Sequence, residues 1–179
     1  MSLICCKPHY TPKPAGYLRI DLPEKNYRVY DSTCPFTFEY PSYGKIVPDT
    51  SRIAEPCWIN IEFPYFGSQI NISYKTVNKN LNNFIEDSRT LAYKHTVKAD
   101  AINETVYTDE ERRVFGLLYE IKGDAASNVQ FYCTDSTSHF LRGSLYFDVQ
   151  PNADSLAPVI NFLKDDIIHL VETLKWKNL

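Results

Sequence analysis

The sequence predicts one α+β domain in which helices cover both faces of an antiparallel β-sheet. Three observations support this fold class. Short runs that alternate apolar and polar residues, typical of half-buried strands, recur along much of the chain. One stretch near the middle and one at the end instead show the helical spacing of apolar residues. The strands follow one another without the regular strand-helix alternation of a parallel sheet, so an antiparallel arrangement is expected.

The first strands are expected after residue 35. Residues 36–40 alternate aromatic and polar side chains until Pro41. Residues 58–63 and 69–74 alternate in the same way, and the short segment between them predicts a hairpin. Residues 80–98 then carry apolar side chains at helical spacing with charged residues between them. This pattern predicts an amphipathic helix.

The second half is expected to be mostly sheet. The segments with strand-like patterns are residues 104–107, 113–121, 128–133 and 140–149. Both faces of residues 113–121 are apolar, so we expect that strand to be central in the sheet and covered on both sides.

The last segment predicts a long helix. An unbroken apolar stripe runs from Leu156 to Leu174, and Asp154 or Ser155 is a suitable first residue. Pro158 is expected in the first turn, where proline is tolerated. No internal repeat or linker to a second domain is apparent in the sequence.

Composition excludes several classes of function. The chain has 179 residues, of which 44% are hydrophobic and 23% charged, as in one globular domain. Its formal net charge of -3 lacks the basic excess of a nucleic-acid-binding protein. The six glycines form neither a dinucleotide-binding pattern nor a P-loop. We therefore expect no nucleotide, no nucleic acid and no cofactor.

Residues 1–30 are expected to form a tether, and residues 31–179 the globular domain. Pro8, Pro12 and Pro14 favour extended backbone in this segment. The tether has a formal charge of +3 and the remainder -6, which suits an anionic membrane surface, although scattered cations are more often simply solvated.

The cysteine pair Cys5 and Cys6 stands where a bacterial lipoprotein carries its lipid. Such proteins are cleaved directly before the cysteine that is acylated. The alternative is two ordinary thiols near a chain end. No apolar run approaches the roughly 18 residues that a membrane-spanning helix needs.

Three further cysteines have different settings. Cys34 and Cys57 each directly precede an alternating run, and in an exported protein they could form a disulfide worth about 3 kcal/mol. If their strands pair in simple antiparallel register, however, the sulfur atoms lie at opposite ends of the pair and cannot meet. Cys133 shares a face with Val129 and Phe131, which predicts a small buried hydrophobic residue.

The histidines do not predict a metal site. His9, His95, His139 and His169 occur without the spacings of zinc ligands. His95 lies on the apolar face of its helix and is expected to be hydrogen-bonded at the core boundary. His169 points away from the C-terminal apolar stripe and is expected to be solvated.

Two features of the sequence could suggest catalysis, a segment with triad residue types and two pairs of adjacent carboxylates. Residues 134–139 contain the Asp, Ser and His of a hydrolase triad, but triad members are usually distant in sequence, and Asp and Ser between two strands are common in turns. The adjacent pairs Glu110–Glu111 and Asp165–Asp166 diverge on regular elements, whereas glycosidase carboxyl groups face each other. We interpret residues 134–139 as a turn and both pairs as solvated.

Tyrosine is unusually frequent, with thirteen residues. Several lie in the first third of the chain: Tyr10, Tyr17, Tyr27, Tyr30, Tyr40, Tyr43 and Tyr65. Tyrosine provides contact area at low entropic cost, so a surface that binds peptide or glycan is an alternative hypothesis. Strand propensity explains part of the excess without a ligand.

Four separated segments carry a family resemblance. They are residues 11–23 (TPKPAGYLRIDLP), 91–100 (LAYKHTVKAD), 138–147 (SHFLRGSLYF) and 172–177 (ETLKWK). In this order they resemble the gliding-motility lipoprotein GldD family of the Bacteroidetes, from about Cys5 to the C-terminus. The order of strands and helices is also similar to the PsbP-type α/β/α sandwich, although a fold alone does not set function.

This resemblance implies an exported, membrane-anchored lipoprotein that faces the periplasm, with Cys5 or Cys6 as the acylated residue. It implies an accessory, non-enzymatic role in gliding motility and type IX secretion, through contacts with other envelope proteins. It also favours the Cys34–Cys57 disulfide. The alternative is a periplasmic glycan- or peptide-binding module that uses the tyrosine-rich surface. A more remote alternative is a hydrolase that uses His139 or Cys133.

Overall fold

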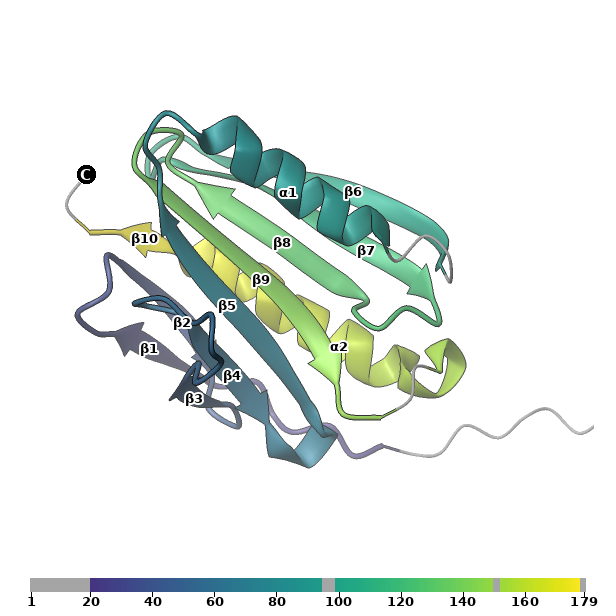
Figure 1. The fold of residues 1–179 in the computed structure, drawn as a ribbon. Coiled ribbons are helices and arrows are strands. Elements are labelled where there is room, and N and C mark those ends of the chain that lie inside the picture. Colours follow the sequence, from purple (N-terminus) through teal and green to yellow (C-terminus); the bar gives the residue numbers. More distant parts are fainter. Residues whose placement is uncertain (1–19, 95–98, 150–151, 178–179) are drawn as a thin grey trace, which may run out of the picture.

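The computed structural model describes residues 20–94, 99–149 and 152–177. Within these ranges ten strands form two antiparallel sheets (Figure 1). The larger sheet has the order β3 (Lys45–Pro48), β4 (Ile59–Phe63), β5 (Ser68–Thr76), β9 (His139–Phe147), β8 (Val129–Thr134), β7 (Val114–Gly123) and β6 (Ala99–Asp109). The smaller sheet has the order β1 (Tyr27–Asp31), β2 (Phe36–Pro41) and β10 (Lys175–Trp176).

Two α-helices lie on opposite faces of the larger sheet. In Figure 1, α1 (Leu81–Tyr93) lies in front of the sheet and α2 (Ala153–Thr173) behind it. A short 3-10 helix, η1 (Pro64–Phe66), connects β4 to β5. The predicted α+β class, with helices on both faces of an antiparallel sheet, is confirmed. Among the described residues, no helix is both long enough and apolar enough to span a membrane.

The predicted apolar stripe of α2 forms the centre of the core. Its buried members are Val159, Ile160, Leu163, Ile167, Leu170 and Val171, followed by the C-cap residue Leu174. The side chain of Asn152 accepts a hydrogen bond from the backbone N–H of Ser155 at 3.1 Å and so caps the first turn. Because α2 begins at Ala153, Pro158 lies in its second turn rather than the first.

The sheet face toward α2 is apolar across its central strands. In the β4–β5 hairpin, Ile59 pairs with Ile72 and Ile61 with Ile70, which confirms the predicted hairpin. Gly143 in β9 permits a close contact on this face, because a Cβ atom there would collide with the ring of Phe131. The hydrophobic effect over this interface is the main stabilising term of the fold.

The helix expected over residues 80–98 begins at Leu81 and has its C-cap at Lys94. The remaining residues, 95–98, including His95, lie outside the described part of the chain. Within α1, Ala92 is fully buried against Tyr119 and Ile121 of β7. The apolar face of α1 therefore packs on β7, on the face of the sheet opposite α2 (Figure 1).

Strand β7 is covered on both faces, as expected, but it is not central. It lies next to the edge strand β6, and the middle position belongs to β9. Val114 of β7 belongs to the core on the α2 side, while Tyr119 packs with α1. Apolar residues on both faces thus report coverage by two helices and not the position of the strand.

The folded domain begins before residue 31, the expected boundary with the tether. All five residues of β1 (Tyr27–Asp31) pair with β2, so the boundary falls inside a strand. Arg28 and the apolar Val29 of this strand are both exposed, so the strand lacks the alternating pattern that predicts a half-buried strand. The structure does not describe residues 1–19.

Candidate functional site

A buried carboxylate lies on α2 where the sequence predicted a solvated one. The side chain of Asp166 is 0% exposed, whereas that of the adjacent Asp165 is 65% exposed. The two residues do diverge, as expected on a helix, but Asp166 turns inward. Its spacing from Leu163 and Leu170 places it on the same side of the helix as the apolar stripe. That spacing was the one feature of the sequence that could have predicted the burial of Asp166.

Three side chains donate hydrogen bonds to Asp166. Lys25 Nζ lies 3.0 Å and Tyr27 Oη 2.9 Å from Oδ1, and the Tyr43 hydroxyl donates to Oδ2. We call Lys25, Tyr27, Tyr43 and Asp166 the Asp166 cluster. Burial of an ionised carboxylate is tolerated because these donors replace water.

The donors of the cluster come from the N-terminal part of the chain. Lys25 precedes β1, and its ammonium group also donates to the carbonyl of Phe162 at 2.8 Å and lies 4.3 Å from the centre of that ring. Burial, followed by the hydrogen bond to Asp166, raises the pKa of both Tyr27 and Tyr43. Both hydroxyls therefore stay protonated and continue to donate.

His169 extends this contact, contrary to the expectation that it is solvated. Its Nε2 lies 2.7 Å from Oε2 of Glu39 in β2, and its ring stacks on Tyr27 with the centroids 3.6 Å apart. One turn further along α2, the hydroxyl of Thr173 accepts the backbone N–H of Glu39 at 2.9 Å. The smaller sheet is thus joined to α2 along half of the helix.

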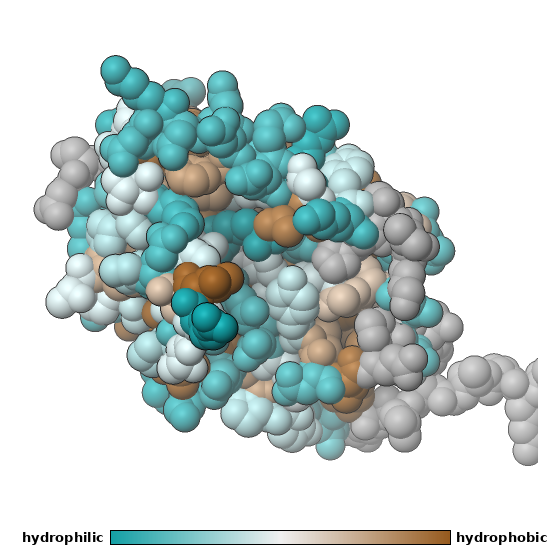
Figure 2. Space-filling model, viewed as in Figure 1, coloured by the Kyte–Doolittle hydropathy of each residue, from teal (hydrophilic) through white to brown (hydrophobic). Residues whose placement is uncertain are grey.

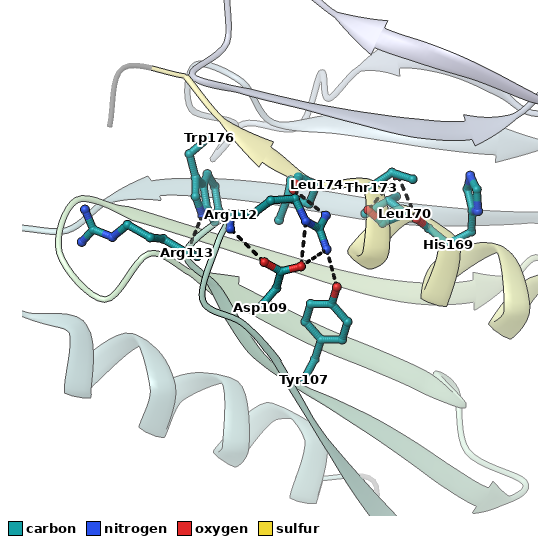
Figure 3. A network of polar contacts seen from close by, with 9 residues as sticks. All are labelled: Tyr107, Asp109, Arg112, Arg113, His169, Leu170, Thr173, Leu174 and Trp176. Carbon is teal, nitrogen blue, oxygen red and sulfur yellow. Dashed lines mark hydrogen bonds and ion pairs between the residues drawn. The ribbon is translucent and has the colours of Figure 1, made fainter.

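A second polar network fixes the C-terminal end of α2 (Figure 3). Arg112, in the β6–β7 turn, donates to the carbonyl of Leu174 at 3.0 Å and to Oδ2 of Asp109 through Nε and Nη2 at 2.9 and 2.7 Å. Trp176 donates from Nε1 to the carbonyl of Arg113 at 3.1 Å. Arg112 thus satisfies a carbonyl that the helix end would leave without a partner.

The predicted cysteine sites differ in what can be described. Cys5 and Cys6, the candidate acylation sites, lie outside the described residues. Cys34 and Cys57 form a disulfide pair in the structure, with Cα atoms 5.6 Å apart. The strands that follow them, β2 and β4, belong to different sheets, so the register that would separate the sulfur atoms does not occur. Cys133 is fully buried, as predicted, and burial raises its pKa to about 12, which disfavours a nucleophilic role.

Residues 134–139, which contain the Asp, Ser and His of a hydrolase triad, form a turn, as expected. Asp135 Oδ1 accepts the backbone N–H groups of Thr137, Ser138 and His139 at 3.0, 2.8 and 2.8 Å. His139 contacts the hydroxyl of Tyr74 at 2.7 Å and stacks on Trp176, rather than facing a serine. Within the described residues, no group of three His, Cys, Asp or Glu side chains could hold a metal ion.

The tyrosines of the first third do not form a groove in the described part of the chain. Tyr27 and Tyr43 belong to the Asp166 cluster, and Tyr30 and Tyr40 pack against the core. Tyr65 is 68% exposed, and Tyr10 and Tyr17 lie outside the described residues. The excess of tyrosine is thus largely explained by internal contacts.

Comparisons with known proteins agree with this architecture. A family model described as gliding motility lipoprotein GldD matches residues 7–176, nearly the whole chain. No curated protein matches the sequence. The solution structure of the cyanobacterial PsbP protein (CyanoP) of Synechocystis sp. PCC 6803 has a similar fold, with a TM-score of 0.51 and 11% identity over 91% of this chain and 99% of that one. At this identity the likeness concerns the fold alone, and it confirms the expected PsbP-like sandwich. The family match is specific, and this chain therefore belongs to the gliding motility lipoprotein GldD family.

Proposed function

We propose that this protein is a non-enzymatic lipoprotein of the cell envelope that faces the periplasm and supports gliding motility and type IX secretion by contacting other proteins. Membership in a family of motility lipoproteins supports the envelope location and the accessory role. In the proposal, acylation of Cys5 or Cys6 determines where the domain is held. Lipoprotein processing adds more than one acyl chain, as stable anchoring requires.

The observation that carries the proposal is the Asp166 cluster. Lys25 and Tyr27 lie where the N-terminal segment enters the folded domain, and both bind a carboxylate on the helix at the centre of the core. A pull on the N-terminal segment is therefore transmitted to α2 and not to a loosely attached edge strand. Such a junction suits a domain that must keep a fixed position relative to a membrane while its partners exert force on it.

The proposal is tested by purification from solubilised envelopes of cells that produce the tagged full-length precursor. We expect defined envelope proteins to co-purify with the wild type, and metabolic labelling with a fatty acid to mark the same band. Recovery without any partner, together with saturable binding of peptidoglycan fragments, would instead support the glycan- or peptide-binding alternative.

The non-enzymatic part needs its own variant. His139→Ala should restore motility and secretion in a deletion strain as well as the wild type does, because His139 packs between Tyr74 and Trp176. Loss of function in a variant that retains its thermal unfolding midpoint would point to catalysis.

A further inference from the structure

The side of the larger sheet that faces α1 contains a cleft of about 700 Å³ beside the helix. Its floor is formed by β4, β5 and β9, and α1 forms one wall. Figure 2 views the molecule from this side, where hydrophilic side chains predominate and hydrophobic ones occur in separate small groups. A volume of this size is typical of sites for small ligands.

A row of polar side chains crosses the floor of the cleft. Asn60, Asn71, Ser144 and Gln130 occupy paired positions on four neighbouring strands, β4, β5, β9 and β8. The residues next to them in each strand point to the opposite face and are apolar, as expected for the core around α2. The two faces of the sheet are thus chemically distinct, and the polar one is only partly covered by α1.

Several polar atoms of this row have no hydrogen-bond partner among the described residues. They are Asn71 Oδ1, Ser144 Oγ and Gln130 Nε2, and Ser144 and Gln130 are each only 1% exposed. A buried polar group without a partner reduces stability unless water or a ligand binds it. Ser144 and Asn71 line the cleft directly.

Arg142 places a cation in the same cleft. Its Nη2 donates to Gln130 Oε1 at 2.5 Å, and no carboxylate of the described residues forms an ion pair with it. Burial lowers the pKa of Arg142, yet the guanidinium group stays charged. The other cation of the cleft, Lys75, already pairs with Glu55. A partly buried guanidinium group without a counter-ion favours an anionic ligand, and a carboxylate matches its planar fork.

The remaining walls are apolar and aromatic. Trp58, Phe84, Leu91 and Phe140 line the cleft, and the indole N–H of Trp58 is engaged with the carbonyl of Tyr74 at 3.0 Å. Asp49 and Asp87 also lie in the lining. These carboxylates oppose a doubly charged phosphate more than a singly charged carboxylate. The cleft thus offers one cation without a counter-ion, two carboxylates, several hydrogen-bonding groups and an apolar wall.

We propose that this cleft binds the C-terminal end of a peptide. Arg142 pairs with the terminal carboxylate, Ser144 and Asn71 bind the last peptide groups, and the wall of Trp58 and Phe140 contacts the last side chain. This inference goes beyond the role in motility and does not rest on the lipid anchor. If either proposal fails its test, the other remains intact.

The test uses a set of N-acetylated tripeptides, Gly-Gly-X, in which X is each of the common amino acids, with the purified 179-residue chain. Binding is followed by amide chemical shifts. At least one peptide acid should bind with shifts at Asn71 and Ser144, and its C-terminal amide should bind at least about tenfold more weakly. Acetate should compete only at far higher concentration. Equal binding of acid and amide, shifts elsewhere, equal competition by acetate, or no binding by any peptide would overturn the proposal.

Variants separate the site from the fold. Arg142→Gln should weaken peptide binding at least about tenfold, while Arg28→Gln on the distant strand β1 should not change it. Ser144→Ala gives a second readout that a purely structural residue would not show. It should raise the thermal unfolding midpoint of the free protein, because it removes a hydroxyl without a partner, and yet weaken binding. Unchanged affinity in both cleft variants would refute the assignment.

Discussion

At the scale of single residues, Asp166 is the polar side chain that links Lys25 and Tyr27, near the start of the folded domain, to α2. Its carboxylate is fully buried and accepts hydrogen bonds from Lys25, Tyr27 and Tyr43. A buried ion pair adds little net stability compared with an apolar contact, but removal of one partner is costly because the others stay buried. The main effect of the cluster is therefore to fix the position of Lys25 and Tyr27 relative to α2, and its net contribution to stability is small.

The first prediction concerns this carboxylate. Asp166→Ala should lower the free energy of unfolding by about 3 kcal/mol, since two tyrosine hydroxyls and an ammonium group lose their shared acceptor. The matched control is Asp165→Ala, which removes an exposed carboxylate and should stay within about 0.5 kcal/mol of the wild type. Urea denaturation of the three proteins measures this, and similar values for both variants would contradict the role of the cluster.

A second prediction follows from the turn around Asp135. Burial alone would raise the pKa of this carboxyl, but the backbone N–H of His139, the hydroxyl of Thr137 and two further N–H groups lower it to about 2. Because the folded-state pKa lies below the ordinary value of 3.8, the contribution to stability is complete above that value and is lost as the pH falls to about 2. The amount is about 2 kcal/mol.

Asp135→Asn tests this sign directly. The variant should be less stable than the wild type at neutral pH, and the difference should shrink steadily below pH 4. Unfolding free energies at a series of acid pH values provide the measurement. A difference that stays constant down to pH 2 would show that the turn does not depend on the charge of Asp135.

At the scale of elements, α2 organises the molecule. One face packs on the larger sheet, its middle binds the N-terminal segment through Asp166, and its C-terminal end is fixed by Arg112. The three contacts use different parts of the chain, so α2 joins the smaller sheet, the larger sheet and the β6–β7 turn into one body.

The third prediction addresses the helix end. Arg112→Lys should lower the free energy of unfolding by about 1–2 kcal/mol, because an ammonium group cannot reach the carbonyl of Leu174, the carboxylate of Asp109 and the hydroxyl of Tyr107 at once. The neighbouring Arg113→Lys keeps the carbonyl that binds Trp176 and should have little effect. Thermal unfolding distinguishes the two, and equal midpoints would argue against a capping role.

Elements with a long periodic pattern were predictable from the sequence, and short ones were not. The stripe of α2 and the β4–β5 hairpin follow directly from apolar spacing. Strands β1, β3 and β10 were missed because they are short and lack a sustained alternating pattern, so their pairing depends on tertiary contacts. The position of β7 was wrong because periodicity reports which faces are covered and not the order of strands.

The candidate site was less predictable than the fold. The expectation that Asp166 is solvated relied on its neighbour Asp165, and its spacing from Leu163 was the better guide. Its partner Lys25 lies more than a hundred residues earlier, and no local pattern reports such a contact. The polar row of the cleft was also not predictable, because each strand contributes only one of its members.

At the scale of the whole molecule, one covalent link complements these contacts. The Cys34–Cys57 pair connects the loop before β2 with the segment before β4, and so joins the two sheets. The fourth prediction is that mass spectrometry without reductant finds this bridge in the exported protein, with Cys133 as a thiol. In the double variant Cys34→Ser, Cys57→Ser, the free energy of unfolding should be about 3 kcal/mol lower than in the wild type. Free thiols at both positions in the exported protein would rule the bridge out.

In the proposed role, the domain as a whole is held in place and recognised by other proteins. The fold likeness to PsbP concerns arrangement only, and family membership supplies the link to motility. In the proposed role, position comes from the acylated N-terminus and is passed to the core through Lys25, Tyr27 and Asp166.

The most direct test of the central claim replaces both candidate acylation sites, Cys5 and Cys6, by alanine in the full-length precursor. Membrane fractionation, gliding and protein secretion are then measured in a gliding bacterium that lacks its own family member. We predict that the doubly substituted protein leaves the membrane fraction and restores neither process, although its purified domain unfolds at the wild-type temperature. Full restoration by a protein that is free of the membrane would contradict it.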